Sequence, residues 1–303
     1  MKPTLRFEAP LLPNEDQFTA PFFQRFQTRP AAEPLQLNDS VSKNYLFPTF
    51  YGDVTCAIGI FLCDYAKAQA LLPHPDMRPV SVPGGRAVVT ISCYEYKNVM
   101  NVPPYNEVAF TIPVLVGAPV SVPVLPLLWG GYPGAGYYVF HMPVTSLENQ
   151  IRGTRIWGLP KVVEEIEVRE EGDECVTSLT NEQGQQYFSL RVPMQGKPGD
   201  FDVGAWIYSR RGDQLVRGRT SFQATFQVNK YTSLLWKDGQ PPARPYLELG
   251  DSPMADTLRG LDMNPQPFQF RFAKHMNAAF DLPDEGYQAP FSFSAQGPSP
   301  LVG

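Results

Sequence analysis

The stretch VAFTIPVLVGAPVSVPVLPLLWGGYPGAGYYVF, residues 108–140, contains no charged side chain. Its length would allow a membrane-spanning helix, because about 20 consecutive apolar residues cross a bilayer. Pro113, Pro119, Pro123 and Pro126 would break such a helix repeatedly. We therefore expect buried strands joined by tight loops here, and no membrane segment.

Strand patterns recur on both sides of this stretch. AVVTISCYEY (87–96) is rich in β-branched and aromatic residues, and SFQATFQVN (221–229) alternates apolar and polar side chains. FQFRF (268–272) alternates in the same way. ECVTSLTNEQGQQYFSLRV (174–192) predicts a hairpin whose turn spans Asn181 to Gly184. These segments indicate a mainly β chain.

Helix signals are few and short. DYAKAQALLP (64–73) predicts a helix capped by Asp64 that ends before Pro73. TSLENQIRG (145–153) contains a capping box from Thr145 to Glu148, with Gly153 as the expected end. Many strands with a few short helices favour an α+β fold of the mainly β type, built as one large barrel or sandwich.

The 303 residues divide by composition into three parts. Residues 1–45 are rich in Pro, Gln and Phe, and we expect an N-terminal arm that packs on the body or on a neighbouring subunit, or is disordered. Residues 46–290 form a single domain in this interpretation. Residues 291–303 are expected to be a loose C-terminal tail.

Composition excludes several classes of function. The net charge is −5 and no long basic run is present, so nucleic acid is not an expected partner.

The N-terminus lacks an apolar segment suited to a signal peptide, which predicts a cytoplasmic protein. Low surface charge favours a homo-oligomer. We expect the four cysteines to be free and buried.

No cofactor or metal is expected from the motifs. The three histidines stand apart without metal-binding spacing. The glycine-rich segment WGGYPGAGYY is followed by strand-like residues, whereas a phosphate cradle needs a helix. His141 could face a pocket, although a core or strand-end histidine is the simpler interpretation.

One lysine lies in an unusually apolar setting within RIWGLPKVVEEIEV, residues 155–168. If residues 157–163 are extended, Lys161 shares a face with Trp157, Leu159 and Val163. The ammonium could simply reach solvent over an apolar stem. Alternatively, burial lowers the lysine pKa, and a neutral amine is a nucleophile for carbonyl carbon.

A second candidate lies in NVPPYNEVAF, residues 101–110. Two prolines favour an extended segment that places Tyr105 and Glu107 on one face. Glu107 could be an ordinary carboxylate at a strand end. It could also lie at the mouth of an apolar pocket, where its environment would suit proton transfer.

PPYNE followed about fifty residues later by GTRIWGLPK resembles the acetoacetate decarboxylase-like family, over roughly residues 45–287. That family carries a G-P-Y-x-E-like segment and a later G-R-E-x-x-x-x-P-K segment with a Schiff-base lysine. The resemblance implies a β-rich, cone-like barrel. It also implies that Lys161 forms the Schiff base and that Glu107 is the pocket carboxylate.

The sequence departs from the family pattern at three points. Val162 stands where decarboxylases carry a second lysine, so burial is the expected sole cause of a lowered Lys161 pKa. The family's G-R-E is Gly-Thr-Arg at 153–155, and GIFLCDY (59–65) lacks the pocket arginine of decarboxylases.

Our leading hypothesis is a carbon–carbon lyase that decarboxylates a β-keto acid, acetoacetate-like or larger, through an iminium on Lys161. Tyr105, Trp157, Arg155 and His141 are the candidate substrate-binding residues. Aldolase or dehydratase chemistry with the same lysine is one alternative. A non-catalytic barrel that binds an apolar small molecule is another.

Overall fold

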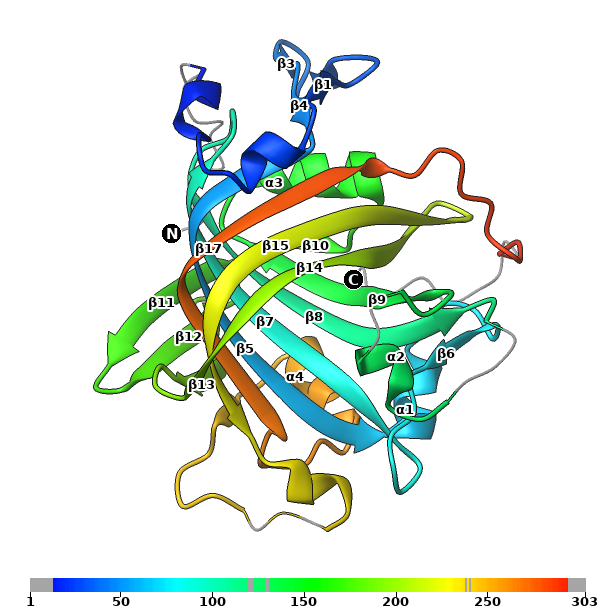
Figure 1. Cartoon of the computed structure of the whole chain (residues 1–303), viewed down its shortest axis with the longest axis vertical. Helices are drawn as coiled ribbons and strands as arrows, with labels where there is room; N and C mark the ends of the chain where they lie inside the picture. Colours follow the sequence, from blue (N-terminus) through cyan, green and yellow to red (C-terminus); the bar gives the residue numbers. More distant parts are fainter. Residues whose placement is uncertain (1–12, 119–121, 129–130, 238, 240, 294–303) are drawn as a thin grey trace.

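The computed structural model describes residues 13–118, 122–128, 131–237, 239 and 241–293. Seven strands pair in the order β9-β14-β15-β17-β5-β7-β8, and β8 pairs back to β9, which closes a barrel. Figure 1 shows these long strands coiling around one another. The predicted barrel is confirmed. Its strands are β5 (Thr49–Asp64), β7 (Arg86–Val99), β8 (Tyr105–Val116), β9 (Ala135–Val144), β14 (Lys197–Arg211), β15 (Gln214–Lys230) and β17 (Gln269–Pro283).

The uncharged stretch 108–140 supplies most of β8 and β9, as predicted. These two strands pair antiparallel, for example Ile112 with Tyr138. Residues 119–121 and 129–130 of the stretch lie outside the described residues. None of the helices in the described residues is both long enough and apolar enough to cross a membrane.

The alternation of side chains separates two cores. On β8, Tyr105 and Ala109 belong to a cluster that, among the described residues, includes none from the second sheet, and this cluster fills the interior of the barrel. Val108 and Phe110 point the other way, into a cluster beneath the second sheet and the flanking helices. The predicted inward face of 221–229 is confirmed, because Ala224 and Phe226 lie in the interior cluster.

The second sheet covers one outer side of the barrel. The predicted hairpin is confirmed, and Gly184 adopts a φ of 78° in its turn. The Asn181 Oδ1 accepts hydrogen bonds from the backbone of Gln183 and Gln185. The strands of this sheet are β11 (Glu165–Glu171), β12 (Glu174–Thr180), β13 (Gln186–Pro193) and β16 (Leu247–Leu249).

The two helices predicted from the sequence are present, but two of the predicted helix ends are wrong. Asp64 caps the first helix as predicted. The cap of α3 is Ser146, not Thr145, because the Thr145 hydroxyl is already the acceptor for the backbone of Asn106. Gly153 does not end the helical segment, which continues as a π-helical turn, Gly153–Trp157. The α-helices are α1 (Tyr65–Ala70), α2 (Leu125–Leu128), α3 (Leu147–Arg152) and α4 (Pro253–Gly260).

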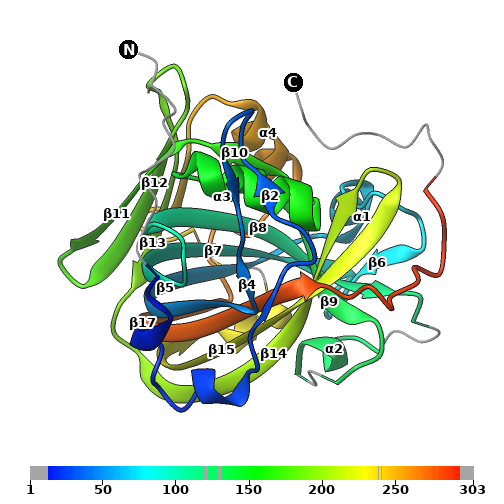
Figure 2. The same cartoon turned by 90° about the horizontal axis from the view of Figure 1, so that it is seen from above.

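The N-terminal arm packs across one end of the barrel. Phe18, Phe22 and Phe23 are buried in a cluster with Phe50 of β5. Figure 2 shows the arm, in blue, passing beside α3. The remaining short elements are β1 (Arg29–Pro30), β2 (Leu35–Gln36), β3 (Ser42–Lys43), β4 (Leu46–Phe47), β6 (Met77–Pro79), β10 (Lys161–Val163) and the 3₁₀ turns Glu15–Gln17, Phe23–Arg25 and Thr232–Leu235.

Residues 294–303 of the predicted tail lie outside the described residues. Just before them, Phe291 stacks on His74 with ring centroids 3.5 Å apart, and Phe293 is buried. The four cysteines are free and buried, as predicted.

Candidate active site

Lys161 is the first residue of β10, which runs parallel to β9 and pairs Lys161 with Met142. The preceding segment is not extended, so the prediction that Lys161 shares a face with Trp157 is wrong. Gly158 adopts a φ of 68° directly after the π-helical turn, and this left-handed residue redirects the chain. Only 5% of the Lys161 side chain is exposed.

The π-helical turn begins directly against the stem of this lysine. A Cβ on Gly153 would lie 2.5 Å from the Lys161 Cε and closer still to its Cδ. Ordinary van der Waals contact begins near 3.4 Å. Glycine is therefore required at position 153 because the backbone of the turn packs directly against the Lys161 side chain, and not because it ends the helix.

Two side chains hold the Lys161 amine. Its Nζ donates to the Glu107 Oε2 at 2.6 Å and to the Asn149 Oδ1 at 3.1 Å. Glu107, on β8, is 7% exposed, and its Oε1 accepts a hydrogen bond from the Tyr96 hydroxyl at 3.2 Å. The Tyr105 ring centroid lies 5.7 Å from Nζ. The structure thus brings Lys161, Glu107 and Tyr105 together inside the barrel.

Burial lowers the pKa of Lys161 below its ordinary value, because the interior solvates the ammonium poorly. The Glu107 carboxylate opposes this change by favouring the charged form. The Arg152 guanidinium adds to it by repulsion. The expectation that burial alone lowers this pKa is therefore wrong, because α3 supplies a cation that Val162 does not.

Arg152 and Asn149 are the site residues that sequence reasoning missed. Arg152 is 1% exposed and donates to the Thr49 hydroxyl at 2.9 Å, while its Nε and Nη1 have no hydrogen-bond partner among the described residues. The Asn149 Nδ2 is likewise buried without a partner there. Free buried donors beside a lysine can receive the oxygens of an anionic ligand.

Tyrosines form the wall around the amine. The Tyr96 ring centroid lies 4.7 Å from that of Tyr51 and 4.8 Å from that of Tyr105. Burial raises the pKa of all three phenols. They are therefore neutral near pH 7, and can donate hydrogen bonds without adding charge to the site.

For three predicted substrate-binding residues, the contacts seen are with groups other than the Lys161 amine. Arg155 is exposed and donates to the backbone carbonyl of Gln36 in the arm. Trp157 packs on Phe280 and donates to a backbone carbonyl.

His141 lies on β9, and its ring contacts Phe110 of the outer cluster. Burial lowers the His141 pKa to about 4. The imidazole is therefore neutral near pH 7.

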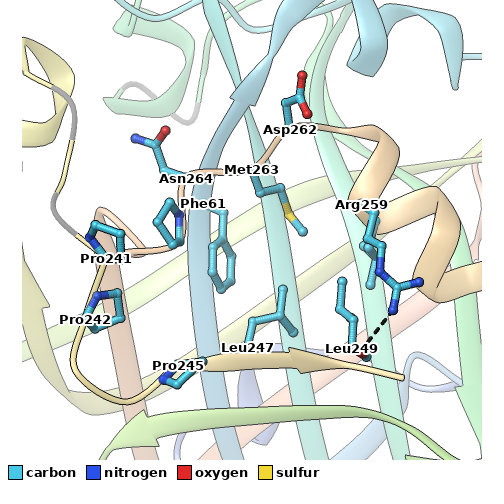
Figure 3. Close-up of a pocket in the computed structure, with 12 residues that line it drawn as sticks. Phe61, Pro241, Pro242, Pro245, Leu247, Leu249, Arg259, Asp262, Met263 and Asn264 are labelled. Carbon is cyan, nitrogen blue, oxygen red and sulfur yellow. Dashed lines mark hydrogen bonds between the residues drawn. The ribbon is translucent and has the colours of Figure 1, made fainter. Parts of the chain in front are cut away.

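The pocket in Figure 3 is a separate feature. It has a volume of about 350 Å³ and lies between α4 and the segment that leads into β16. Leu247, Leu258 and Met263 line it together with several prolines. Within the described residues, no group of His, Cys, Asp and Glu side chains could hold a metal ion.

Comparisons with known proteins agree with this architecture. The family model for acetoacetate decarboxylase matches residues 32–206, more than half of the chain. The structure of acetoacetate decarboxylase from Legionella pneumophila has a TM-score of 0.51 at 15% identity, with 81% of this chain and 88% of that chain covered. A structure from structural studies of acetoacetate decarboxylase has a TM-score of 0.54 at 13% identity, with 81% and 90% covered.

The enduracididine biosynthesis enzyme MppR, in complex with pyruvate, has a TM-score of 0.51 at 11% identity, with 83% of this chain and 96% of that chain covered. Comparison with curated proteins by sequence finds no match. At these identities, the likeness to solved structures shows a shared fold.

Proposed function

The chain belongs to the acetoacetate decarboxylase family, and on that premise we propose that it is a lyase that decarboxylates a β-keto acid through a Schiff base on Lys161. The observation that carries this proposal is the buried amine, 2.6 Å from the Glu107 carboxylate. Burial increases the neutral, nucleophilic fraction of an amine. Acetoacetate decarboxylase is itself the standard example of a lysine activated by desolvation or by a cationic neighbour.

The reaction begins when the neutral Lys161 nitrogen attacks the ketone carbon. The carbonyl oxygen leaves as water and an iminium forms. The bond to the carboxylate then breaks, its electron pair enters the iminium to give an enamine, and CO₂ departs. A proton adds to the enamine carbon, and water hydrolyses the resulting iminium to the ketone product and the free amine.

Glu107 is the proposed general acid and base in this reaction. Its carboxylate accepts the hydrogen bond of the Lys161 amine, so it can take the proton that the ammonium must lose before attack. The same carboxyl group can return a proton to the leaving oxygen.

Arg152 and Asn149 are the proposed binding groups for the substrate carboxylate. The free Nε and Nη1 of Arg152 and the free Nδ2 of Asn149 are buried donors on α3, the helix that also supplies the Oδ1 acceptor to Lys161. A carboxylate in this position would satisfy them. A keto acid therefore fits the site better than a neutral ketone.

Aldol or dehydratase chemistry on a keto acid is the second candidate, and Arg152 is the observation that favours it. A carboxylate loses its charge when it departs as CO₂, so a strong pairing with Arg152 stabilises the ground state more than the transition state. Chemistry that retains the carboxylate avoids this cost. A structurally similar enzyme, MppR, is described in complex with the condensation product of pyruvate and imidazole 4-carboxaldehyde.

The test is turnover of a substrate panel by the purified chain. Acetoacetate, longer β-keto acids, and pyruvate with and without an aldehyde are incubated at neutral pH, and CO₂ and products are measured. We expect CO₂ from at least one β-keto acid, with a loss of more than about 1,000-fold in Lys161→Met.

The matched control is Lys274→Met, at an exposed lysine, which should retain the wild-type rate. Condensation or dehydration without CO₂ release would establish the second candidate instead. Tight binding of a panel member without turnover would support a non-catalytic barrel and overturn both enzymatic functions.

A further inference from the structure

The N-terminal arm reaches α3 through a buried carboxylate. Glu148 is 6% exposed, and its Oε1 accepts hydrogen bonds from the Tyr45 hydroxyl at 2.7 Å and from the Lys43 Nζ at 2.9 Å. A buried carboxylate is costly unless it is paired, and both partners here belong to the segment 43–45. The arm therefore contributes the groups that allow Glu148 to be buried.

Tyr45 makes a second contact with the same helix. Its ring lies under the Arg152 guanidinium, with the Cζ of Arg152 4.3 Å from the ring centroid. Glu148 and Arg152 are four residues apart and therefore lie on one face of α3. Tyr45 is 1% exposed, so its hydroxyl meets the carboxylate and its ring meets the guanidinium inside the protein.

We propose that Tyr45 is a positioning residue: from the N-terminal arm, it holds Arg152 in place beside the Lys161 site. The ring restrains the guanidinium by a cation–π contact, which is strongest when the cation is desolvated. Glu148 fixes the ring through the hydroxyl. This inference concerns the arm and goes beyond the proposed function, although its effect on turnover rests on that function.

The consequence is measurable at Lys161, because burial lowers the pKa of this amine and the Arg152 guanidinium adds to that lowering. If Arg152 leaves its place, its contribution is lost and the pKa of Lys161 should rise. The charged and titratable groups around the pair are Glu107 and Tyr105 from β8, Tyr96 from β7, Tyr51 from β5, Glu148 from α3, and Lys43 and Tyr45 from the arm.

The test is competitive labelling of the full chain with acetic anhydride over a range of pH, with Lys161 followed by mass spectrometry. Tyr45→Leu removes both the hydroxyl and the ring, and the labelling curve of Lys161 should move to higher pH. Tyr45→Phe keeps the ring on the guanidinium but loses the hydroxyl that fixes it, so its curve should lie between those of the wild type and Tyr45→Leu. If Tyr45→Leu does not fold, Tyr45→Met replaces it with the same expectation, because Met fills irregular core space.

Arg25→Gln is the matched control, because it breaks an exposed ion pair between the arm and Asp202. Its labelling curve should equal that of the wild type. An unchanged curve in the Tyr45→Leu or Tyr45→Met variant overturns the inference, as does an equal shift in Arg25→Gln. Labelling needs no turnover, so a failure of the substrate panel tests the proposed function separately.

If that function holds, the low-pH limb of kcat/KM in Tyr45→Leu should move with the labelling curve. Below the limb, kcat/KM should then fall by the factor that the shift of the limb implies, which is about tenfold for each pH unit. A uniform loss at every pH, with the limb in place, would reduce Tyr45 to a structural role.

Discussion

Replacing Gly153 with alanine should damage the site while leaving the fold intact. The new Cβ would lie 2.5 Å from the Lys161 Cε, and ordinary contact begins near 3.4 Å, so the stem must move by about 0.9 Å. If this movement carries Nζ directly away from Glu107, the Nζ–Oε2 distance grows from 2.6 Å to about 3.5 Å. A hydrogen bond of that length is weak.

The expected cost of Gly153→Ala is roughly 100-fold in kcat/KM, the effect of a reacting group misplaced by about 1 Å. This corresponds to about 2.7 kcal/mol in the barrier. Global stability should change little, because alanine favours the helical turn by about 0.5–1 kcal/mol and offsets part of the crowding. The assay is steady-state turnover of the best panel substrate, together with urea unfolding.

Gly260→Ala is the matched control, since this glycine ends α4 and a Cβ there meets no atom within 4 Å. It should keep wild-type activity. If Gly153→Ala retains activity within twofold of the wild type, the close packing of the turn on Lys161 does not position the amine. A large loss of stability in parallel with activity would also refute the reasoning.

Three further predictions concern single side chains. Glu107→Gln should lower kcat by roughly 100-fold with a smaller effect on KM. The low-pH limb of the kcat/KM profile should also move to lower pH, because the carboxylate that raises the Lys161 pKa is removed. A limb that moves to higher pH would contradict this reasoning. Lys161→Met should destabilise the chain by about 3–5 kcal/mol in urea at pH 7, because Glu107 remains buried without its cation; wild-type stability would count against the pairing. As the pH falls from 6.5 to about 4, the free energy of unfolding should decrease, because His141 binds a proton in the unfolded chain but stays neutral in the folded one. Thermal unfolding at pH 7 and pH 4.5 should therefore show a smaller difference in His141→Leu than in the wild type.

Much of the fold follows from local pattern in the sequence. The alternation through Phe222–Val228 predicts one inward face, and Ala224 and Phe226 lie there. The prolines of 108–140 argue against a helix, and β8 and β9 occupy most of that stretch. The closure of the barrel depends on the pairing of β9 with β14, a contact between residues about 70 apart in the sequence that periodicity does not reveal, for example Tyr137 with Ile207.

Parts of the site were less predictable, for reasons of backbone geometry. The family-like segment directs attention to Arg155, but the π-helical turn departs from the period of 3.6 residues, so side-chain directions after Arg152 cannot be counted along an α-helix. Arg155 consequently lies at the surface and Arg152 inside. The signal that could have found Arg152 is its spacing of three from Asn149 on a capped helix just before the lysine.

The central claim is that the Lys161 amine is neutral often enough to attack a ketone. Its most direct test is borohydride reduction of the native chain with a reactive keto acid at pH 7, followed by peptide mass spectrometry. The account predicts a reduced adduct on Lys161 and little on exposed lysines such as Lys274. Modification of Lys274 without Lys161, across the substrate panel, would contradict it.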